Sequence, residues 1–284
     1  MATHEMLYRL LGFAGTFLAV AIFEWVRPRR QLTQDKKKRW QKNLLLILVD
    51  TVAMRLVLPI SFVLLAYSAQ EAGWGLLNVL DLPGWIRFLV GFFALDLVIY
   101  LQHLMFHAVP LLWRLHMVHH ADMDIDVTTG LRFHPIEIIL SGLIKMATIA
   151  AIGPPPEAVL AFEIALNATS LFNHGNIFIP TRLDSILRLF VVTPDMHRVH
   201  HSVTIRETNS NFGFNFPWWD RIFRTYRAQP VMGHHGMTIG LSHIRYESNL
   251  GLIGLLLLPF TGDQGAYPIN RSGQDPEILI KGRK

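Results

Sequence analysis

The sequence predicts an all-α fold, an integral membrane helix bundle that forms one domain over residues 1–284. Hydrophobic residues make up 51% of the chain and charged residues only 17%, and the apolar positions gather in long runs. Runs of this kind are typical of helices that cross a bilayer. Ten of the fourteen histidines lie between positions 103 and 201. A site built from imidazole groups is therefore expected within a membrane bundle.

Three apolar runs are long enough to cross the membrane as helices. They cover residues 7–26, 43–67 and 85–107, and each offers roughly the 20 apolar positions that a hydrocarbon core about 30 Å thick requires. The first run has no basic segment before it and no small-residue cleavage site after it, so we expect a retained helix rather than a secretory signal. Residues 1–84 are thus expected to form two N-terminal spans.

Two shorter apolar stretches, residues 136–152 and 158–172, follow the third run. They are joined by the sequence Gly-Pro-Pro-Pro at residues 153–156, which cannot continue a helix because proline lacks an N–H group and its ring clashes with the preceding turn. Each arm is short for a full span. A tilted or re-entrant hairpin and two complete crossings are both compatible with these lengths.

Basic side chains set the expected orientation. The loop at residues 27–42 is strongly basic, whereas residues 68–84 contain two acidic residues and no Lys or Arg. By the positive-inside rule the basic loop is cytoplasmic, and counting the spans onward places every histidine cluster at the cytoplasmic face. This loop also accounts for the sequence pI of about 9.6. It is expected to contact anionic lipid, and no nucleic acid partner is expected.

Three histidine clusters stand out by their spacing, one H-x-x-x-H and two H-x-x-H-H. The clusters are His103 and His107; His116, His119 and His120; and His197, His200 and His201. Side chains three and four positions apart share one face of a helix, so each cluster can present its rings together. One metal ion needs three or four protein ligands, and eight imidazoles at these spacings indicate a site for two metal ions. The chain contains no cysteine, which excludes thiolate ligands.

Two further histidines are candidate ligands. His174 continues a polar stripe of Glu163, Asn167 and Ser170 along an otherwise apolar helix, which favours a helix whose inner face lines the site. His134 opens the hairpin. For His134, metal ligation and a role as a helix cap or hydrogen-bonding partner remain equally open.

Several other polar residues are candidates for hydrogen bonds to the ligand imidazoles. Asp96 lies within the third span, where a carboxylate is costly and usually faces the protein interior, and we expect it to accept a hydrogen bond from the N–H of a ligand histidine of another segment. The same role is expected for Asp195, Asn211 and Asp220, with ordinary capping and turn formation as the alternative. His234 and His235 lie outside the spacing pattern and are expected in solvent.

Missing motifs narrow the chemistry. The sequence has no H-E-x-x-H, no Glu followed by His three residues later, no G-x-S-x-G and no G-x-G-x-x-G. These absences disfavour a zincin-type protease, a carboxylate-rich di-iron bundle, a serine hydrolase and a built-in nicotinamide or flavin site. A zinc-dependent membrane hydrolase that uses the same histidines and a non-catalytic metal-binding protein remain as alternatives.

Six segments resemble the motifs of the fatty acid hydroxylase superfamily, which includes sterol desaturases, sterol methyl oxidases, fatty acid hydroxylases and alkylglycerol monooxygenase. The segments are HLMFH from His103, HMVHH from His116, FHPIE from Phe133, NHGN from Asn173, TPDMHRVHHS from Thr193 and SNFGFNFPWWDRIFRTY from Ser210. They cover roughly residues 90–226. We therefore expect a catalytic core over residues 85–228, followed by a generic tail over residues 229–284, in which the stretch 251–260 forms either an amphipathic interfacial segment or a lid.

The resemblance implies a di-iron centre that uses O2 and two electrons to hydroxylate or desaturate an unactivated C–H bond of a lipid such as a sterol or a fatty acid. Two iron ions are the implied cofactor, and zinc can replace them in purified protein. The implied metal ligands are His103, His107, His116, His119, His120, His174, His197, His200 and His201, with His134 as a further candidate. The chain shows no redox domain, so electrons are expected from an external reductase, ferredoxin or cytochrome b5-like donor.

The chain departs from the superfamily pattern at two positions. Some hydroxylases have a histidine four residues before the position of His174, where this chain has Ser170. The WDRxFGT pattern of bacterial members has Arg224 in place of its glycine. The first departure leaves the number of ligands open, and the second is expected to alter only a turn.

Overall fold

The computed structural model describes residues 2–246 and 250–270, and all regular secondary structure within them is helical. Three isolated β-bridges connect loops. The helices are α1 (Ala2–Val26), α2 (Lys36–Val57), α3 (Phe62–Glu71), α4 (Leu76–Val79), α5 (Gly84–Ala108), α6 (Pro110–His120), η1 (Thr129–Leu131), α7 (Pro135–Ile152), α8 (Pro156–Asn173), α9 (Thr181–Leu187), α10 (Pro194–His200), α11 (Ile205–Thr208), α12 (Trp218–Ile222), α13 (Gly233–Gly236) and α14 (Leu252–Thr261).

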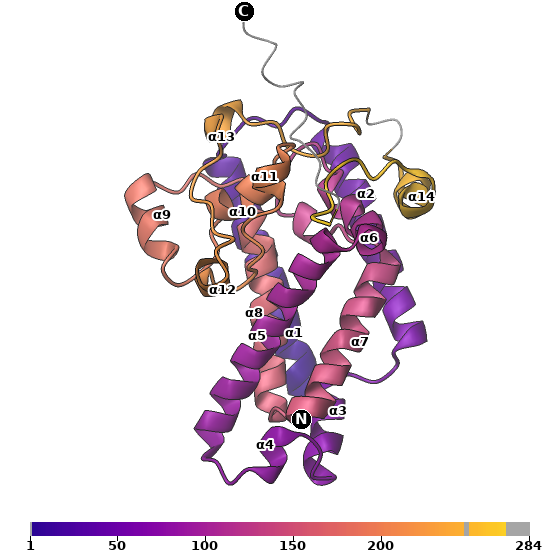
Figure 1. The fold of residues 1–284 in the computed structure, drawn as a ribbon, viewed down its shortest axis with the longest axis vertical. Coiled ribbons are helices and arrows are strands. Elements are labelled where there is room, and N and C mark those ends of the chain that lie inside the picture. Colours follow the sequence, from indigo (N-terminus) through magenta and orange to yellow (C-terminus); the bar gives the residue numbers. More distant parts are fainter. Residues whose placement is uncertain (1, 247–249, 271–284) are drawn as a thin grey trace, which may run out of the picture.

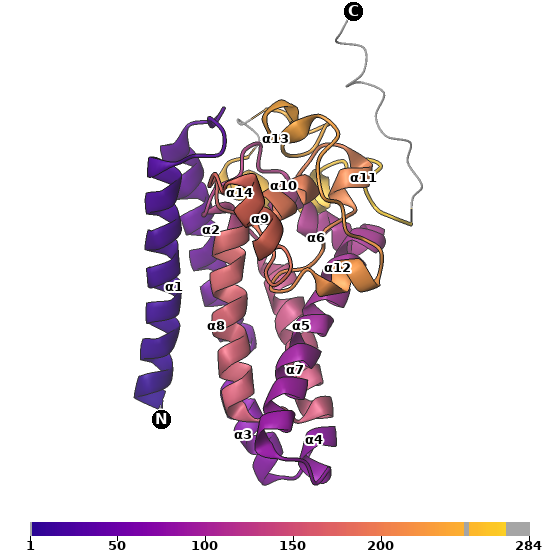
Figure 2. The same cartoon turned by 90° about the vertical axis from the view of Figure 1, so that its left-hand side faces the viewer.

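The long helices form a bundle, and the short helices gather at one end of it (Figure 1). Helix α1 packs along α8, α5 packs against α7 and α8, and α2 and α3 pack against α7. The quarter-turn view shows the same division, with α1 at the outer edge of the bundle and α9 to α14 above α5 and α8 (Figure 2). The bundle therefore supports a cap of short helices at one end.

Four helical segments among the described residues are long and apolar enough to cross a membrane. They are Glu5–Val26, Lys36–Val79, Gly84–Ala108 and Pro135–Ile152. Their outer faces carry large apolar side chains, such as Leu11 and Ile22 on α1 and Leu48 and Leu56 on α2, that are about half exposed or more. Lipid contact explains this exposure, since water would oppose it. The prediction of an all-helical integral membrane protein is confirmed.

The second predicted span is not one continuous helix. The apolar run over residues 43–67 is interrupted after Val57, and a new helix begins at Phe62. Pro59 explains the break, because a proline disfavours helical geometry in the preceding residue and donates no hydrogen bond. Ser61 then caps α3 by accepting a hydrogen bond from the Leu64 N–H at 3.1 Å. The proline signal was present in the sequence, and the predicted run lies within one candidate span, Lys36–Val79, that contains more than one helix.

The hairpin of α7 and α8 turns where the Gly-Pro-Pro-Pro sequence was expected to end the helix. Gly153 ends α7 in a left-handed conformation with φ 66°, and α8 begins at Pro156. Gly75 packs directly against this turn, since a Cβ atom on Gly75 would lie 2.4 Å from the Gly153 nitrogen. The two glycines allow the loop before α4 and the turn between α7 and α8 to meet backbone to backbone.

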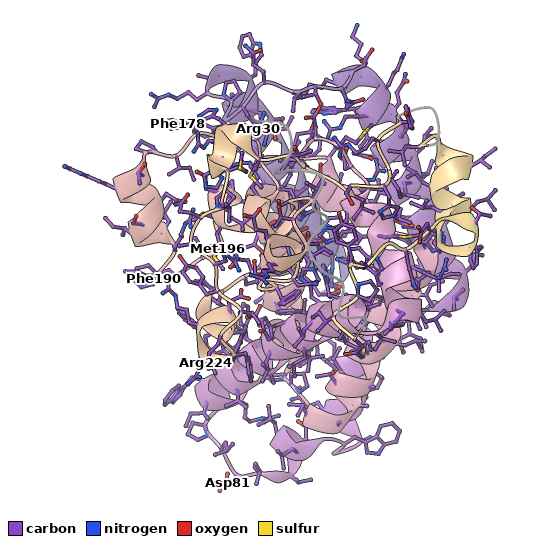
Figure 3. All side chains as sticks on the ribbon, turned by 45° about the horizontal axis from the view of Figure 1, so that its top comes forward. Arg30, Asp81, Phe178, Phe190, Met196 and Arg224 are labelled. Carbon is purple, nitrogen blue, oxygen red and sulfur yellow. The ribbon has the colours of Figure 1, made fainter. Side chains whose placement is uncertain are left out.

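The basic segment at residues 27–42 and the histidine-bearing segments lie at the same end of the bundle. The backbone of this segment bonds to the end of α8, where the Arg29 N–H donates to the Asn176 carbonyl at 2.9 Å. Arg30 lies near Phe178 at this end, and Asp81 lies at the opposite end (Figure 3). The common end expected from span counting is therefore present, and its assignment to the cytoplasm stays a prediction.

Candidate metal centre

Nine buried histidines meet in two adjacent groups. The five-histidine group contains His103, His107, His116, His120 and His200, and the four-histidine group contains His119, His174, His197 and His201. Within each group the candidate ligand nitrogens lie within 4.8 Å of one another. The groups touch, since the ring centroids of His120 and His201 are 4.7 Å apart. The structure thus brings together nine of the ten candidate ligands.

Each H-x-x-H-H motif supplies both groups. On α6, His116 and His120 are four residues apart and share one face, whereas His119 points toward the other group. At α10, His197 and His201 form the pair that is four residues apart, and His200 belongs to the other group. Successive helical positions differ by about 100° in direction, and this rotation allows one short helix to reach two metal ions.

Backbone carbonyl groups orient four of the rings. The Nδ1 atom of His103 lies 2.7 Å from the Phe212 oxygen, and that of His200 lies 2.7 Å from the Ser210 oxygen. The Nδ1 atom of His119 lies 3.0 Å from the Arg132 oxygen. The Nδ1 atom of His174 lies 2.6 Å from the Ser170 oxygen. A carbonyl oxygen can only accept, so each Nδ1 carries the proton and each Nε2 keeps its lone pair for a metal ion.

Side chains orient two more rings. The Glu137 Oε1 accepts a hydrogen bond from His116 Nδ1 at 2.6 Å, and the Asn209 Oδ1 accepts one from His107 Nδ1 at 3.0 Å. The Asn209 amide donates to the Tyr267 carbonyl at 2.8 Å, which establishes which of its atoms faces the histidine. Tyr267 stacks on Trp113 beside the group. The segment near residue 267 therefore contributes to the site, although the sequence pattern marked it as generic.

The Nε2 atoms of neighbouring histidines lie so close together that a cation between them would relieve the repulsion between their lone pairs. The separation is 3.1 Å between His103 and His116 and also 3.1 Å between His119 and His174. Burial lowers the pKa of His116 to about 3 and that of His174 to about 4, so both rings are neutral. Opposed lone pairs at this distance repel each other. Two imidazole nitrogens that each bind one ion at about 2.1 Å would lie no more than about 4.2 Å apart, so each pair is close enough to share an ion.

Other ring nitrogens of the site have no hydrogen-bond partner in the part of the chain that the structure describes. Both nitrogens of His120 and His201 are buried in this way, as are His107 Nε2, His197 Nδ1 and His200 Nε2. A buried polar atom without a partner is costly. Metal coordination would compensate one nitrogen of each of these rings, and the donor set suits a metal that prefers imidazole.

His134 lies outside both groups. Its Nδ1 accepts a hydrogen bond from the Ile136 N–H at 3.2 Å, which caps α7, and its Nε2 lies 3.2 Å from the Leu256 carbonyl. The ring therefore connects the start of α7 to α14. Of the two roles left open by the sequence, the structure places His134 in the capping position.

The polar residues expected to hold ligand histidines contact other groups. Asp96 accepts a hydrogen bond from the Trp219 indole at 2.7 Å. Asp195 forms ion pairs with Arg29, at 3.0 Å, and with Arg198. Burial alone raises the pKa of Asp195, but the neighbouring Arg198 outweighs it and holds the pKa below its usual range. Both carboxylates connect segments around the site without bonding to an imidazole of either group.

Asn211 and Asp220 act on the ligands through the backbone. Asn211 adopts φ 56° and its amide bonds to the backbone of Met196 and Arg227. Asp220 accepts hydrogen bonds from the N–H groups of Phe212 and Gly213 at 2.8 and 2.9 Å. Together they hold the loop whose carbonyl groups orient His103 and His200. They therefore position the ligand histidines indirectly, through the backbone carbonyl groups of this loop, and do not bond to the rings themselves.

Glu137 is the residue that the sequence reasoning missed. It lies within the FHPIE segment in the first turn of α7, and a carboxylate at the start of an apolar helix was the available signal. His234 was also misjudged, because it is buried, with its Nε2 3.5 Å from an oxygen of Asp195. Its neighbour His235 is exposed, as expected.

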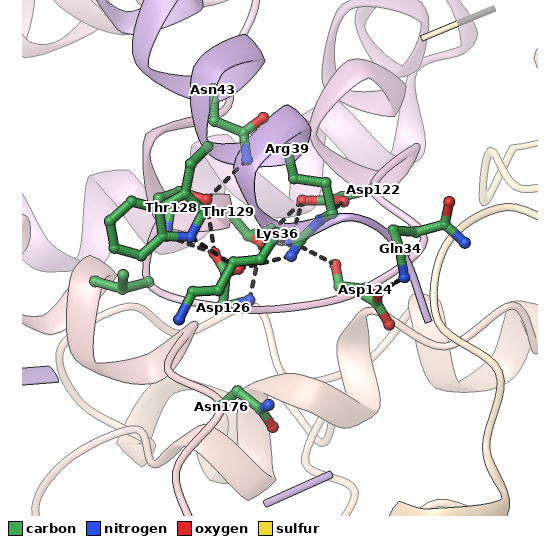
Figure 4. A network of polar contacts seen from close by, with 12 residues as sticks. Gln34, Lys36, Arg39, Asn43, Asp122, Asp124, Asp126, Thr128, Thr129 and Asn176 are labelled. Carbon is green, nitrogen blue, oxygen red and sulfur yellow. Dashed lines mark hydrogen bonds and ion pairs between the residues drawn. The ribbon is translucent and has the colours of Figure 1, made fainter. Parts of the chain in front are cut away.

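A buried ionic network supports the loop that follows His120. Arg39 of α2 pairs with Asp122 at 2.8 Å and with Asp126 at 2.6 Å, and Thr129 and Thr128 complete the hydrogen bonding (Figure 4). Burial alone raises the pKa of Asp122, but Arg39 outweighs this effect and holds it well below the usual range. The network attaches the basic end of α2 to the histidine-bearing segment.

A cavity of about 500 Å³ reaches the five-histidine group from within the bundle. Its walls include His103 and His116 together with apolar side chains of α2, α5, α7 and α8. The polar stripe of α8 predicted to line the site faces this cavity through Glu163, Asn167 and Ser170. The fold and the site together define a membrane-embedded helical protein with a histidine-rich centre that can hold two metal ions.

Comparison with known proteins shows which family the histidine-bearing part of the chain resembles. Residues 88–225 match the family model described as fatty acid hydroxylase. This part of the chain is therefore similar to the fatty acid hydroxylase family, and the resemblance seen in its motifs is confirmed. No solved structure shows a significant match to the chain.

Three curated relatives illustrate the likeness. Ornithine lipid hydroxylase OlsE of Rhizobium tropici is 28% identical over 70% of this chain and 55% of its own length. Human alkylglycerol monooxygenase is 29% identical over 52% of this chain and 32% of its own length. Human cholesterol 25-hydroxylase is 28% identical over 48% of this chain and 49% of its own length. The chain therefore matches between about a third and just over half of each relative.

Proposed function

We propose that the protein is a membrane-bound di-iron oxygenase that hydroxylates or desaturates an unactivated C–H bond of a lipid. The observation that carries this proposal is the pair of buried histidine groups, whose Nε2 atoms converge without protons between them and which adjoin an apolar cavity. The names of the relatives, which are lipid hydroxylases and monooxygenases, support the reaction class.

The ligand count favours iron over zinc. Catalytic zinc is usually held by three protein ligands and one water molecule, whereas the two groups offer five and four imidazoles. A zinc-dependent hydrolase would also need a base aimed at bound water. The carboxylate beside the ligands, Glu137, instead forms a hydrogen bond with the Nδ1 atom of His116. We therefore place two iron ions, one in each group, and keep zinc as a substitute in purified protein.

Iron ions held by the two histidine groups would supply the activation of O2; in hydroxylation, one oxygen atom would enter the C–H bond and the other would leave as water, with two electrons and two protons taken up. The protein itself orients the ligand rings and excludes water from the site. Carbonyl groups hold the rings, and Phe133, Phe212 and Phe214 pack against histidines of the site. These apolar walls exclude water, which protects the oxidant and strengthens the site's electrostatics.

The substrate is a lipid that reaches the centre through the cavity between α2, α5, α7 and α8. Hydroxylation and desaturation begin with removal of the same hydrogen atom, and both reactions fit this centre. Electrons come from an external reductase, ferredoxin or cytochrome b5-like donor that docks at the basic end of the bundle, where Arg27, Arg29 and Arg30 lie. We assign this end to the cytoplasm.

Metal analysis of purified protein, made without added zinc, tests the proposal. We expect about two iron ions per chain and consumption of O2 on reduction. His119→Ala and His200→Ala each remove one ligand from a different group and should abolish lipid oxidation and lower the iron content. His243→Gln is the matched control, because His243 is exposed and lies outside both groups. Zinc without O2 consumption, or full activity in either alanine variant, contradicts the proposal.

A further inference from the structure

Two buried carboxylates in the cavity beside the metal centre have unused acceptor atoms. Asp50 of α2 and Glu137 of α7 are each 4% exposed. The Oδ1 atom of Asp50 and the Oε2 atom of Glu137 have no hydrogen-bond partner among the described residues. Both residues line the cavity of about 500 Å³ that reaches His103 and His116. Buried carboxylates are normally paired with a donor or a cation.

A third acceptor faces the same cavity. Gln102 of α5 lines it, and its Oε1 is buried without a partner within residues 2–246 and 250–270. Gln102 precedes His103, and Glu137 bonds to His116. The acceptors therefore come from three different helices, and two of them, Gln102 and Glu137, adjoin residues of the five-histidine group.

Two of the three basic residues that line the cavity are engaged elsewhere, and the third, Arg55, lies five residues beyond Asp50 on α2, about 7.5 Å along the helix. Arg9 donates to Glu163 at 2.6 Å, and Lys145 lies over the Phe62 ring at 4.3 Å. Lys145 is eight residues beyond Glu137 along α7, which corresponds to about 12 Å. In the described structure no basic side chain forms an ion pair with Asp50. The cavity thus has spare acceptors near the metal centre, and its basic side chains lie farther along the helices.

We infer that Asp50, Gln102 and Glu137 bind the polar end of a lipid substrate that carries hydrogen-bond donors, an amine or a pair of hydroxyl groups. This inference rests on the proposed oxygenase function and names the substrate class of that site. A donor-bearing head group satisfies all three acceptors, whereas an ester or ether end leaves them unpaired. The cavity volume lies in the range of small-ligand pockets and holds the polar end with the first part of the chain.

The position of the acceptors also predicts where the lipid is oxidised. Glu137 contacts His116 directly, so a head group bound to its free oxygen lies beside the metal centre. The carbon atoms nearest the head group are then the ones presented for oxidation. The far end of the acyl or alkyl chain extends away from the histidines.

Calorimetric titration of the metal-loaded, full-length protein with three twelve-carbon probes tests the inference. The probes are dodecylamine, 1,2-dodecanediol and methyl dodecanoate, whose polar end cannot donate. We expect the amine or the diol to bind at least about tenfold more tightly than the ester, and the better of the two identifies the donor as charged or neutral. Mass spectrometry of the oxidised product should place the new hydroxyl group or double bond near the polar end.

Asp50→Asn should remove most of this preference, because one acceptor is replaced by an amide that also donates. Thr51→Val is the matched control, since Thr51 lines the same cavity but its hydroxyl is already bonded to the Ile47 carbonyl at 2.8 Å. Iron content and the thermal midpoint verify that each variant folds. If Asp50→Asn does not fold, Gln102→Leu serves as a second variant. Equal affinity for all three probes in the native protein overturns the inference. A retained preference without O2 consumption contradicts the oxygenase and leaves the acceptor site supported.

Discussion

At the scale of single residues, the partner of one ring nitrogen decides what the other can do. Six of the nine clustered histidines have Nδ1 bonded to an acceptor, a carbonyl group in four cases and a side chain in His107 and His116. The proton of each of these rings is thereby held on Nδ1, which leaves the lone pair of Nε2 free to bind a metal ion. The sequence indicated which histidines gather, since their spacing is local, but it did not indicate their partners, because Glu137 and Asn209 reach the site only through packing.

Glu137→Gln tests the contribution of one such partner. The amide can still accept from His116 but carries no charge, so the imidazole becomes a weaker ligand, and we expect iron affinity to fall by about 10- to 100-fold. Competition with a chelator measures this change. Glu157→Gln is the control, because Glu157 begins the neighbouring helix in an exposed position. Equal iron retention in both variants would show that the carboxylate does not tune the site.

At the scale of elements, short helices and loops are held in place by contacts from distant parts of the chain. Helices α6 and α10 each serve both histidine groups, and neither could hold that orientation alone. The loop after His120 is attached to α2 by Arg39, and the hairpin of α7 and α8 is attached to the loop before α4 by Gly75 and Gly153. The helical pattern predicted these elements, while the attachments depend on residues far apart in sequence.

Arg39→Met is expected to destabilise the protein by about 3–5 kcal/mol, because it leaves Asp122 and Asp126 buried without their cation. The thermal midpoint of the purified protein in detergent should fall, and iron content should fall with it, since Asp122 follows His120 closely. Lys38→Met changes the preceding residue, whose side chain is exposed, and should unfold like the native protein. An unchanged midpoint in Arg39→Met would mean that the network carries little stability.

Gly153→Ala tests the contact between the two turns. The added Cβ would lie 2.7 Å from the Trp74 carbonyl oxygen and 2.6 Å from the Asn78 side-chain nitrogen. Gly73→Ala is the control, because Gly73 also has a positive φ, 70°, but open space around it. Left-handed geometry costs an alanine about 1–2 kcal/mol at either position, so the additional loss in Gly153→Ala measures the backbone contact. Equal loss in thermal stability would rule out a steric role.

At the scale of the whole molecule, the arrangement divides the chain into an apolar helix bundle and a cap of short helices that carries histidines of both groups. The apolar surfaces of α1 and α2 face outward, and α14 covers α6 at the cap, where Arg114 donates to the Pro259 carbonyl at 3.1 Å. The stretch expected as an interfacial segment or a lid is thus packed against a histidine-bearing helix. The cap and the basic segment lie together at one end of the bundle (Figure 1).

Thiol labelling tests this orientation in the membrane, and the absence of native cysteine makes single substitutions unambiguous. Lys37→Cys and Val231→Cys place exposed thiols at the metal-binding end, and Asp81→Cys places one at the opposite end. We expect an impermeant maleimide to label the first two from the cytoplasmic side only and the third from the other side only. Labelling of all three from one side would contradict the spanning arrangement.

The sequence by itself predicted the membrane class, most helical elements and ten candidate histidines, of which nine gather, because hydropathy and helical spacing are properties of neighbouring residues. It also contained the proline that breaks the second span. Only the tertiary structure decided how the histidines divide into groups of five and four and that Glu137, rather than Asp96, bonds to a ligand ring. These outcomes depend on how helices rotate and pack against one another, and no local pattern records that rotation.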